Sequence, residues 1–200
     1  MLDIVIATRN RHKFRELTAL LAVPGIRWRS LAAHPGAPVV RETGRSFEAN
    51  AVKKARAVAR ATGRLAVADD SGLEVETLHW GPGVRSARFA GSHGDDRANN
   101  RKLLRLLAGL PPHRRRARYR CVLALASPSG VLAVARGTWT GRIAQAPRGR
   151  GGFGYDPLFL VPALGRTVGQ LAPAVKQRLS HRSRAARRLL PALRRLARAA

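Results

Sequence analysis

The chain opens with LDIVIATRNRHKFRELTALL, residues 2–21, where a short run rich in β-branched residues is followed at once by apolar residues at helical spacing. The run 2–7 predicts a buried parallel strand, because such strands are nearly continuous in Val, Ile and Leu. Apolar residues then recur every three or four positions from Phe14 to Leu21, which predicts an amphipathic helix with Asn10 as its N-cap. The chain is therefore expected to begin as strand, turn and helix.

The same alternation continues along the chain. Residues 47–62 predict a second helix, capped by Ser46 and closed by Gly63. The apolar run 65–68 predicts another buried strand, which delivers Asp69-Asp-Ser-Gly72 at its C-terminal end. Helices alternating with buried strands are typical of an α/β fold.

The second half adds antiparallel pairing to this pattern. A third helix is expected to start at Asp95 or Asp96 and to stop at Gly109, and residues 119–126 and 131–139 predict a β-hairpin. The hairpin makes the predicted sheet mixed. We interpret residues 1–200 as a single α/β domain with no repeat and no linker.

The last part of the chain is expected to be a glycine-rich loop and a helical tail. Glycines crowd residues 141–154, and the pattern from His181 onward is helical. Pro191 interrupts that pattern, so a kink or a break is expected there.

Composition indicates a globular chain, because 45% of the residues are apolar. The only cysteine, Cys121, lies in an apolar run and is expected to be a reduced core residue. No apolar run reaches the ~20 residues that span a bilayer, and the N-terminus resembles no signal peptide. We therefore expect a soluble, cytoplasmic protein without a membrane partner.

Charge is the unusual feature of the composition. Thirty-eight Lys and Arg against eleven Asp and Glu give a net charge of +27. A basic surface attracts polyanions, but a general bias toward arginine explains the excess equally well. The acids are the more informative residues: ten precede residue 97 and the eleventh is Asp156. The adjacent pair Asp69-Asp70 is the natural place for a metal site in so basic a chain.

Two segments have features that favour phosphate binding. The turn Thr8–Lys13 leads from a strand into a helix start, where free backbone N–H groups and the helix dipole favour anions. Asn50 and Lys54 share one helix face, where they could contact phosphate, and Glu42 nearby could bind a metal. An ordinary capped helix and a solvated helix face remain the alternatives for these two segments.

The segment Asp69-Asp-Ser-Gly72 indicates a catalytic metal site more strongly than the two segments above indicate phosphate binding. Adjacent carboxylates at a strand end are costly unless cations compensate them, and functional sites of α/β sheets lie at that edge. Mg²⁺ uses few protein carboxylates together with phosphate oxygens, and a carboxylate here could deprotonate a water. A plain turn is the alternative.

The segment 149–157 favours a base pocket. Its match to G-x-G-x-x-G lacks the strand–turn–helix context, so we do not interpret it as a dinucleotide motif. Phe153 could stack on a base, and Asp156 or main-chain amides could read the base edge; a glycine-rich loop is the alternative. Lys176 and residues 180–182 could complete a polar wall, although a basic run is more often solvated. The chain contains no Walker motif, C-x-x-C, H-E-x-x-H or G-x-S-x-G.

In this order the segments resemble the inosine triphosphate pyrophosphatases, also called XTP/dITP diphosphatases. Eight motifs carry the resemblance nearly from end to end. They are Ala7-Thr-x-Asn-x-x-Lys13, Glu42-Thr-Gly44, Phe47-x-x-Asn-Ala-x-x-Lys-Ala55, Asp69-Asp-Ser-Gly-Leu73, Pro82-Gly-Val-x-Ser-Ala-Arg-Phe-Ala-Gly91, Asn99-Asn-x-Lys-Leu-Leu104, Gly151-Gly-Phe-Gly-Tyr-Asp-Pro157 and Ser180-His-Arg182.

The resemblance implies two α/β lobes around a long mixed sheet with a substrate cleft, in a homodimer. It implies Mg²⁺-dependent hydrolysis of ITP, dITP and XTP to the monophosphate and pyrophosphate, which cleanses the nucleotide pool. It further implies that Glu42 and Asp70 are the magnesium ligands and that Asp70 also accepts the proton. The implied substrate contacts are Thr8, Arg9, Asn10, Arg11, His12, Lys13, Lys54, Ser71, Phe153, Gly154, Tyr155, Asp156, Lys176, His181 and Arg182.

The chain departs from the family pattern at one place. Many members carry a glutamate just before the lysine at Lys176, whereas this chain has Ala174 and Val175. Two other functions remain as alternatives. A Maf-like pyrophosphatase would prefer other modified nucleotides, and a nucleic-acid-binding protein is disfavoured because aromatic residues are few.

Overall fold

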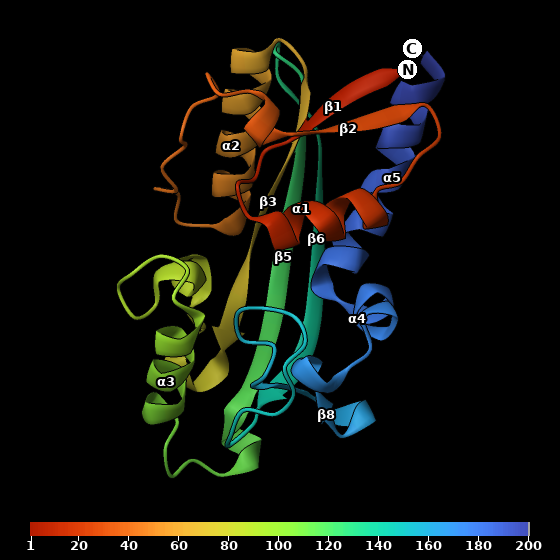
Figure 1. Ribbon diagram of the computed structural model, residues 1–200. Helices are drawn as coiled ribbons and strands as arrows, with labels where there is room; N and C mark the ends of the chain where they lie inside the picture. Colours follow the sequence, from red (N-terminus) through yellow and green to blue (C-terminus); the bar gives the residue numbers. More distant parts are fainter. Residues whose placement is uncertain (200) are drawn as a thin grey trace. The chain divides into compact units, whose positions relative to one another are not determined.

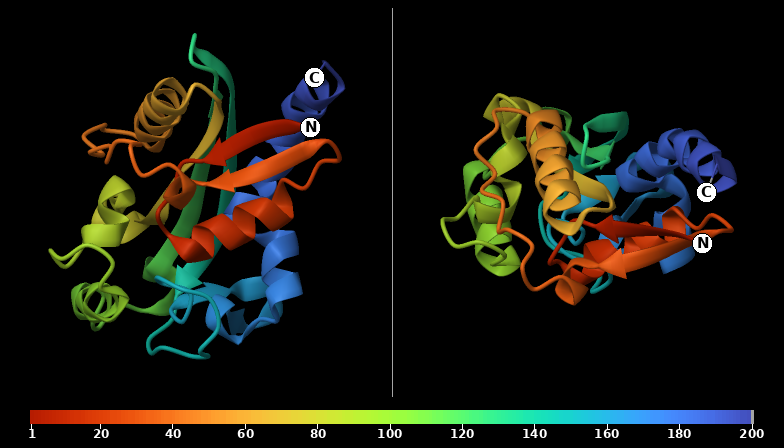
Figure 2. Two further views of the ribbon diagram at one scale, coloured as in Figure 1. Left: turned by 45° about the horizontal axis from the view of Figure 1, so that its top comes forward. Right: turned by 90° about the horizontal axis from the view of Figure 1, so that it is seen from above.

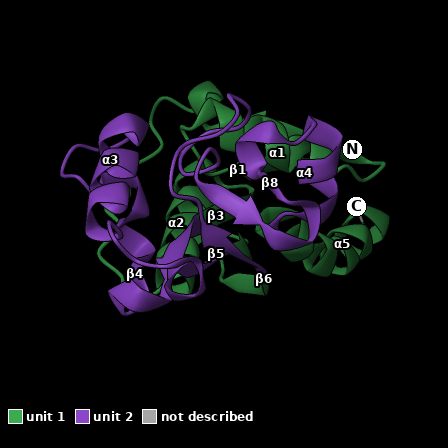
Figure 3. Ribbon diagram, turned by 90° about the horizontal axis from the view of Figure 1, so that it is seen from below, with its two compact units in different colours: residues 1–70, 121–137, 181–200 green, residues 71–120, 138–180 purple. Residues whose placement is uncertain are grey.

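The structure is a computed structural model that describes residues 1–199, shown in Figure 1. Its mixed sheet has the strand order β2-β1-β3-β5-β6-β7-β8, with β4 paired to β3. β1 is parallel to both β2 and β3, whereas β4, β7 and β8 pair antiparallel. The predicted α/β fold on a mixed sheet is confirmed. The chain divides into two compact units, coloured separately in Figure 3, and each is described by itself.

Unit 1 comprises residues 1–70, 121–137 and 181–200. The predicted opening is confirmed, since a parallel strand runs into a helix whose N-cap is Asn10. Gly63 ends the second helix with a left-handed backbone, φ 63°, as its C-cap position requires. The elements of unit 1 are β1 Leu2–Ile6, α1 Arg11–Leu20, β2 Ile26–Ser30, α2 Phe47–Thr62, α5 His181–Ala199 and parts of β3 Leu65–Val75, β5 Arg116–Ala126 and β6 Val131–Ile143.

The core of unit 1 lies on one face of its strands. Side chains of β1, β3 and β5 pack there against the apolar stripes of α1 and α5. Figures 1 and 2 show α2 on the opposite side of these strands. The buried Cys121 belongs to this core, as predicted. The main members of the cluster are Ile4, Ile6, Leu17, Leu21, Val67, Leu123, Leu125, Ala185, Leu189 and Leu193.

Unit 2 comprises residues 71–120 and 138–180 and has a core rich in aromatic residues. Tyr119 stacks on Phe159 with ring centroids 4.4 Å apart, and Trp139 packs on the same ring. The third helix, expected to start at Asp95 or Asp96, has Asp95 as its N-cap and ends at Leu106, before the expected Gly109. Besides its parts of β3, β5 and β6, unit 2 holds β4 Gly81–Pro82, α3 Asp96–Leu106, β7 Phe159–Val161, β8 Arg166–Thr167 and α4 Pro173–Leu179.

Two sequence predictions need correction. The strand expected to end at Ala68 continues to Val75, so Asp69 and Asp70 lie within β3 and not at its end. The parallel pairing with β1 nevertheless stops at Val67, so the two acids follow directly after the parallel ladder. Of the kink or break expected at Pro191, the break is absent, because α5 continues through this residue to Ala199. No helix in residues 1–199 is long and apolar enough to cross a bilayer.

Candidate functional site

Asn10 caps the N-terminus of α1. The side-chain oxygen of Asn10 accepts hydrogen bonds from the amides of His12 and Lys13, at 2.9 and 3.0 Å, and Thr8 in turn accepts one from the Asn10 amide. Arg11 and His12 are exposed, as is Arg9. The turn therefore presents cationic side chains at the positive end of a helix, which suits an anion.

Asp69 lies at the centre of a buried ion cluster in unit 1. Its carboxylate accepts hydrogen bonds from Lys13 Nζ at 2.5 Å, Arg182 Nε at 3.0 Å and Cys121 Sγ at 3.2 Å. Arg182 also donates to Glu16. Burial alone would raise the pKa of Asp69, but Arg182 and Lys13 outweigh it and hold that pKa well below its usual value. Asp69 is therefore a fixed anion that orders the cations around it.

Asp70 has the opposite environment. It is 4% exposed, and its Oδ2 atom is buried without a hydrogen-bond partner. Burial raises the pKa of Asp70 to about 6; Lys54 opposes this rise and the negative charge of Glu42 adds to it. An orphaned carboxylate oxygen with a raised pKa is typical of a site that awaits a proton or a cation.

Lys54 holds the acids of this site together. Its Nζ atom donates to Glu42 Oε1 and to the carbonyl oxygen of Asp69, both at 2.7 Å, and lies 3.7 Å from Asp70 Oδ1. Burial would lower the pKa of Lys54, but Asp70 and Glu42 outweigh it and the pKa rises. The ammonium group is therefore a permanent cation.

Asn50 does not present its amide to solvent, because its side chain is fully buried. Its Oδ1 atom accepts a hydrogen bond from the Gly44 amide at 2.7 Å, and its side chain also hydrogen-bonds to Asp70. A Cβ atom at Gly44 would lie 2.6 Å from that Oδ1 atom, so a glycine is required there. Asn50 thus fixes the loop that carries Glu42, in place of the phosphate contact considered from the sequence.

The donor set suits a divalent ion that uses few protein ligands. Among residues 1–199, no group of three or more His, Cys, Asp or Glu side chains forms a ready-made metal cage. Glu42 and Asp70, however, converge on Lys54, and one Asp70 oxygen has no partner. Two carboxylates completed by phosphate oxygens and water match the coordination habits of Mg²⁺.

Unit 2 brings together a second set of the predicted residues. The Asp156 carboxylate is buried and accepts hydrogen bonds from Tyr119 Oη at 3.1 Å, Lys176 Nζ at 2.8 Å and the Phe153 amide at 2.9 Å. Lys176 Nζ also lies 4.6 Å from the centroid of the Phe153 ring. No acid stands directly before Lys176 in the sequence, and Asp156 holds its ammonium group.

Two hydrogen bonds join α3 to the loop that carries Phe153 and Asp156. The Gly154 amide donates to Asp96 Oδ2 at 2.7 Å, and Asn100 Nδ2 donates to the Gly154 carbonyl at 3.0 Å. Gly152 has φ 77°, and a Cβ atom there would lie 2.0 Å from Asp156 Oδ2. Backbone and carboxylate therefore approach too closely for any other residue.

The remaining predicted residues are placed as follows. Tyr155 is 5% exposed and donates to the carbonyl of Ser86 at 2.9 Å, so its ring belongs to the core of unit 2. Ser71 follows Asp70 in β3 and is partly buried. His181 and Arg182 begin α5 and are both buried. Unit 1 thus gathers Lys13, Glu42, Lys54, Asp70 and Arg182, and unit 2 gathers Phe153, Gly154, Asp156 and Lys176.

Sequence reasoning missed the structural supports of both sets. The residues alone left open which of the two adjacent carboxylates would act, but neighbouring residues of a strand point to opposite faces. Extending the predicted strand through both acids would have revealed this. The other missed residues are Glu16, Asp96, Asn100 and Tyr119, whose partners lie far away in the sequence.

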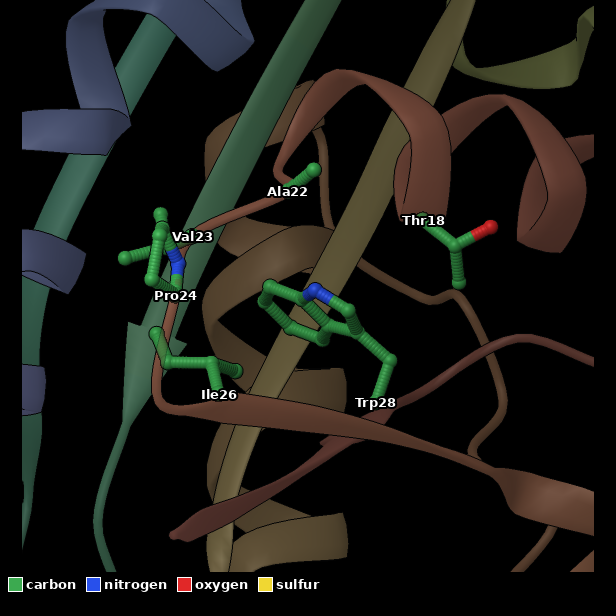
Figure 4. Close-up of a pocket in the computed structure, with 6 residues that line it drawn as sticks. All are labelled: Thr18, Ala22, Val23, Pro24, Ile26 and Trp28. Atoms are coloured by element: carbon green, nitrogen blue, oxygen red, sulfur yellow. The ribbon is translucent and has the colours of Figure 1, made fainter.

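An open apolar hollow of about 340 Å³ lies in unit 1, away from the predicted site residues. Figure 4 shows the indole of Trp28 lying across it, with Pro24 and Ile26 on one side and Thr18 on the other. No charged residue lines it, so it does not suit a polyphosphate.

Comparison with known sequences identifies close relatives. The profile described as Ham1 family matches residues 4–192. A dITP/XTP pyrophosphatase of Geobacillus kaustophilus (strain HTA426) is 50% identical over 189 residues, which cover 94% of this chain and 93% of that protein. A dITP/XTP pyrophosphatase of Mycolicibacterium paratuberculosis (strain ATCC BAA-968 / K-10) is 50% identical over 206 residues, which cover 100% and 99%.

Two solved structures resemble this chain over nearly its whole length. A HAM1 protein from Coxiella burnetii superposes with a TM-score of 0.88 at 40% identity, covering 96% of this chain and 98% of that one. A nucleoside-triphosphatase / dITP/XTP pyrophosphatase from Mycobacterium abscessus gives a TM-score of 0.78 at 46% identity, covering 95% and 100%.

Proposed function

Because the chain belongs to the Ham1 family, we propose that it hydrolyses dITP, ITP and XTP to the nucleoside monophosphate and pyrophosphate, and so cleanses the nucleotide pool. It is a hydrolase of phosphoric anhydrides, as its relatives are. The observation that carries the proposal is the buried, partnerless Oδ2 atom of Asp70 beside Glu42 and Lys54. The ammonium group of Lys54 can neutralise phosphate charge, and the two carboxylates can bind the metal ion that accompanies a triphosphate.

The start of α1 and Lys54 receive the phosphates. Asn10 fixes the first turn, and Lys13 is held in place by Asp69. Holding the triphosphate in one geometry is itself a large part of catalysis for this kind of reaction. Thr8, Arg9, Arg11, His12 and Ser71 complete the proposed phosphate side.

Glu42 and Asp70 are the proposed ligands of Mg²⁺, which when bound neutralises phosphate charge. Asp70 also takes the proton of the attacking water. The water oxygen bonds to the α-phosphorus, the bond from that phosphorus to the bridging oxygen breaks, and pyrophosphate leaves. A carboxylate with a pKa near 6 is suited to accept a proton near neutral pH.

The purine is the proposed ligand of the Phe153 cluster. Phe153 offers a ring face for stacking, and Lys176 offers an N–H donor beside it. Asp156 orients that lysine and the Phe153 amide. An N–H of Lys176 can donate to the 6-oxo group of the purine but not to a 6-amino group, because two donors that face each other both stay unpaired. The family resemblance assigns Gly154, Tyr155, His181 and Arg182 to the base side as well.

The proposal includes a cytoplasmic homodimer, the arrangement that the family resemblance implies. A Maf-like enzyme would have the same kind of chemistry on other nucleotides, so substrate choice separates the two. We expect pyrophosphate release from ITP, dITP and XTP at least 100-fold faster, in kcat/KM, than from ATP, CTP or UTP. Omission of Mg²⁺ should abolish it. Faster turnover of UTP or CTP would favour the Maf-like alternative, and no pyrophosphate from any of them would contradict both.

Metal affinity should depend on pH. Protons and Mg²⁺ compete for Asp70, whose pKa is raised to about 6 by burial. Calorimetric titration with Mg²⁺ should therefore give an affinity about tenfold weaker at pH 5 than at pH 7. In Glu42→Gln the affinity should be weaker throughout and the midpoint should move to lower pH, because Glu42 no longer raises the pKa of Asp70. A pH-independent affinity would contradict the assignment.

A further inference from the structure

The last helix, α5, carries a row of exposed arginines that the proposed hydrolysis does not use. We define the α5 arginine face as Arg188, Arg194, Arg195 and Arg198, all of them exposed. At 100° and 1.5 Å per residue they lie within an arc of about 120° and span about 15 Å. We propose that this face binds the phosphodiester backbone of duplex nucleic acid, without reading its sequence.

The helix that carries this face lies in a part of the chain without acidic residues. The sequence from residue 157 to residue 200 contains no Asp or Glu. Arg188 donates to the main-chain carbonyl of Arg136, whose own side chain pairs with Glu48. Within the described part of the chain, Arg194, Arg195 and Arg198 form no ion pair. Their charges are therefore available to an external anion.

The spacing of the charges favours a polymer over a single nucleotide. A duplex presents one phosphate per ~3.4 Å along each strand, so a row of about 15 Å faces several phosphates at once. A triphosphate is much shorter than this row. α5 contains no aromatic residue and no Asn or Gln to contact base edges. The proposal assigns the arginines of the α5 arginine face to phosphate contacts, which carry no sequence information.

The opposite face of α5 argues against a membrane. A basic amphipathic helix that lies on lipid buries its apolar side among the acyl chains. Here that side is already buried: Ala185, Leu189 and Leu193 are at most 1% exposed and pack in the core of unit 1. Only the arginines are left to make contacts, which suits a polyanion in water.

The test compares two helices of one protein. Arg194, Arg195 and Arg198 are replaced together by Gln, and the matched control replaces Arg97, Arg101 and Arg105, exposed residues on one face of α3. Both variants lose three positive charges. Binding of a fluorescein-labelled 20-base-pair DNA of arbitrary sequence is measured by anisotropy at several salt concentrations.

We expect the α5 variant to bind at least tenfold more weakly, with the slope of log affinity against log salt reduced by about one per arginine. The α3 control should change less than threefold, and Lys at the three α5 positions should restore binding. Pyrophosphate release should stay unchanged in the α5 variant. Equal losses in both variants would show attraction by net charge only and overturn the proposal. Tighter binding of phosphatidylserine vesicles than of DNA through the same arginines would overturn it as well.

Discussion

Asp70→Asn is expected to abolish turnover and to stabilise the protein. The amide cannot take a proton from water and is a poor ligand for Mg²⁺, so kcat should fall by at least about 10³-fold. Stability should change in the opposite direction. Burial raises the pKa of Asp70 from 3.8 to about 6, and ionising it at neutral pH costs about 2–3 kcal/mol of folding free energy. The neutral amide avoids that cost.

The pH dependence of the free energy of unfolding tests whether ionised Asp70 destabilises the fold. Because the pKa of folded Asp70 is above its unfolded value, its contribution to stability is complete below pH 4 and is lost as the pH rises through about 6. Denaturant unfolding without metal should therefore show Asp70→Asn more stable than the parent at pH 8 and similar to it at pH 4. Normal turnover in the variant, or a loss of stability at pH 8, would contradict the role given to Asp70.

Arg182→Met should have the largest effect on folding. The guanidinium is 2% exposed and donates to both Asp69 and Glu16. Removing one partner of a buried ion pair leaves an uncompensated charge, which typically costs 3–5 kcal/mol. Lys13 remains beside Asp69, so we expect the free energy of unfolding at pH 7 to fall by about 3 kcal/mol. Urea denaturation followed by circular dichroism measures it.

Two further variants isolate the cause. Arg194→Met, an exposed arginine on the same helix, should change stability by less than about 0.5 kcal/mol. Adding Asp69→Asn to Arg182→Met removes the carboxylate that has lost its arginine partner. The double variant should therefore recover part of the lost free energy of unfolding. The deficit of the single variant should also shrink in acid, because the low pKa of Asp69 stabilises the parent only above the unfolded pKa. A double variant no more stable than the single one would contradict this explanation.

Local patterns predicted the elements that local forces determine. Asn10, Ser46 and Asp95 cap helices where the sequence placed the caps, and each accepts a backbone N–H of its own first turn. The parallel strand at the N-terminus was predicted from its β-branched residues alone. The strand Ile26–Ser30 was not predicted, because its alternation of apolar and basic residues lasts for only five positions.

Long-range pairing limited the prediction of the site. Arg182 lies 113 positions from Asp69, and no periodicity relates the two. The division of labour between Asp69 and Asp70 depends on which cations reach each carboxylate, and this follows from packing. The family motifs named Glu42, Lys54 and Asp70, and the structure brings these three together in unit 1. It was the tertiary structure that identified Asn50 as the support of the Glu42 loop.

The most direct measurement is a crystal structure of the protein with Mg²⁺ and an ITP analogue whose α–β bridge cannot be hydrolysed. We expect one magnesium ion with carboxylate oxygens of Glu42 and Asp70 about 2.1 Å away, and a water within hydrogen-bond distance of Asp70 and in line with the α-phosphorus. A bound analogue whose metal ion contacts neither Glu42 nor Asp70 would contradict the account.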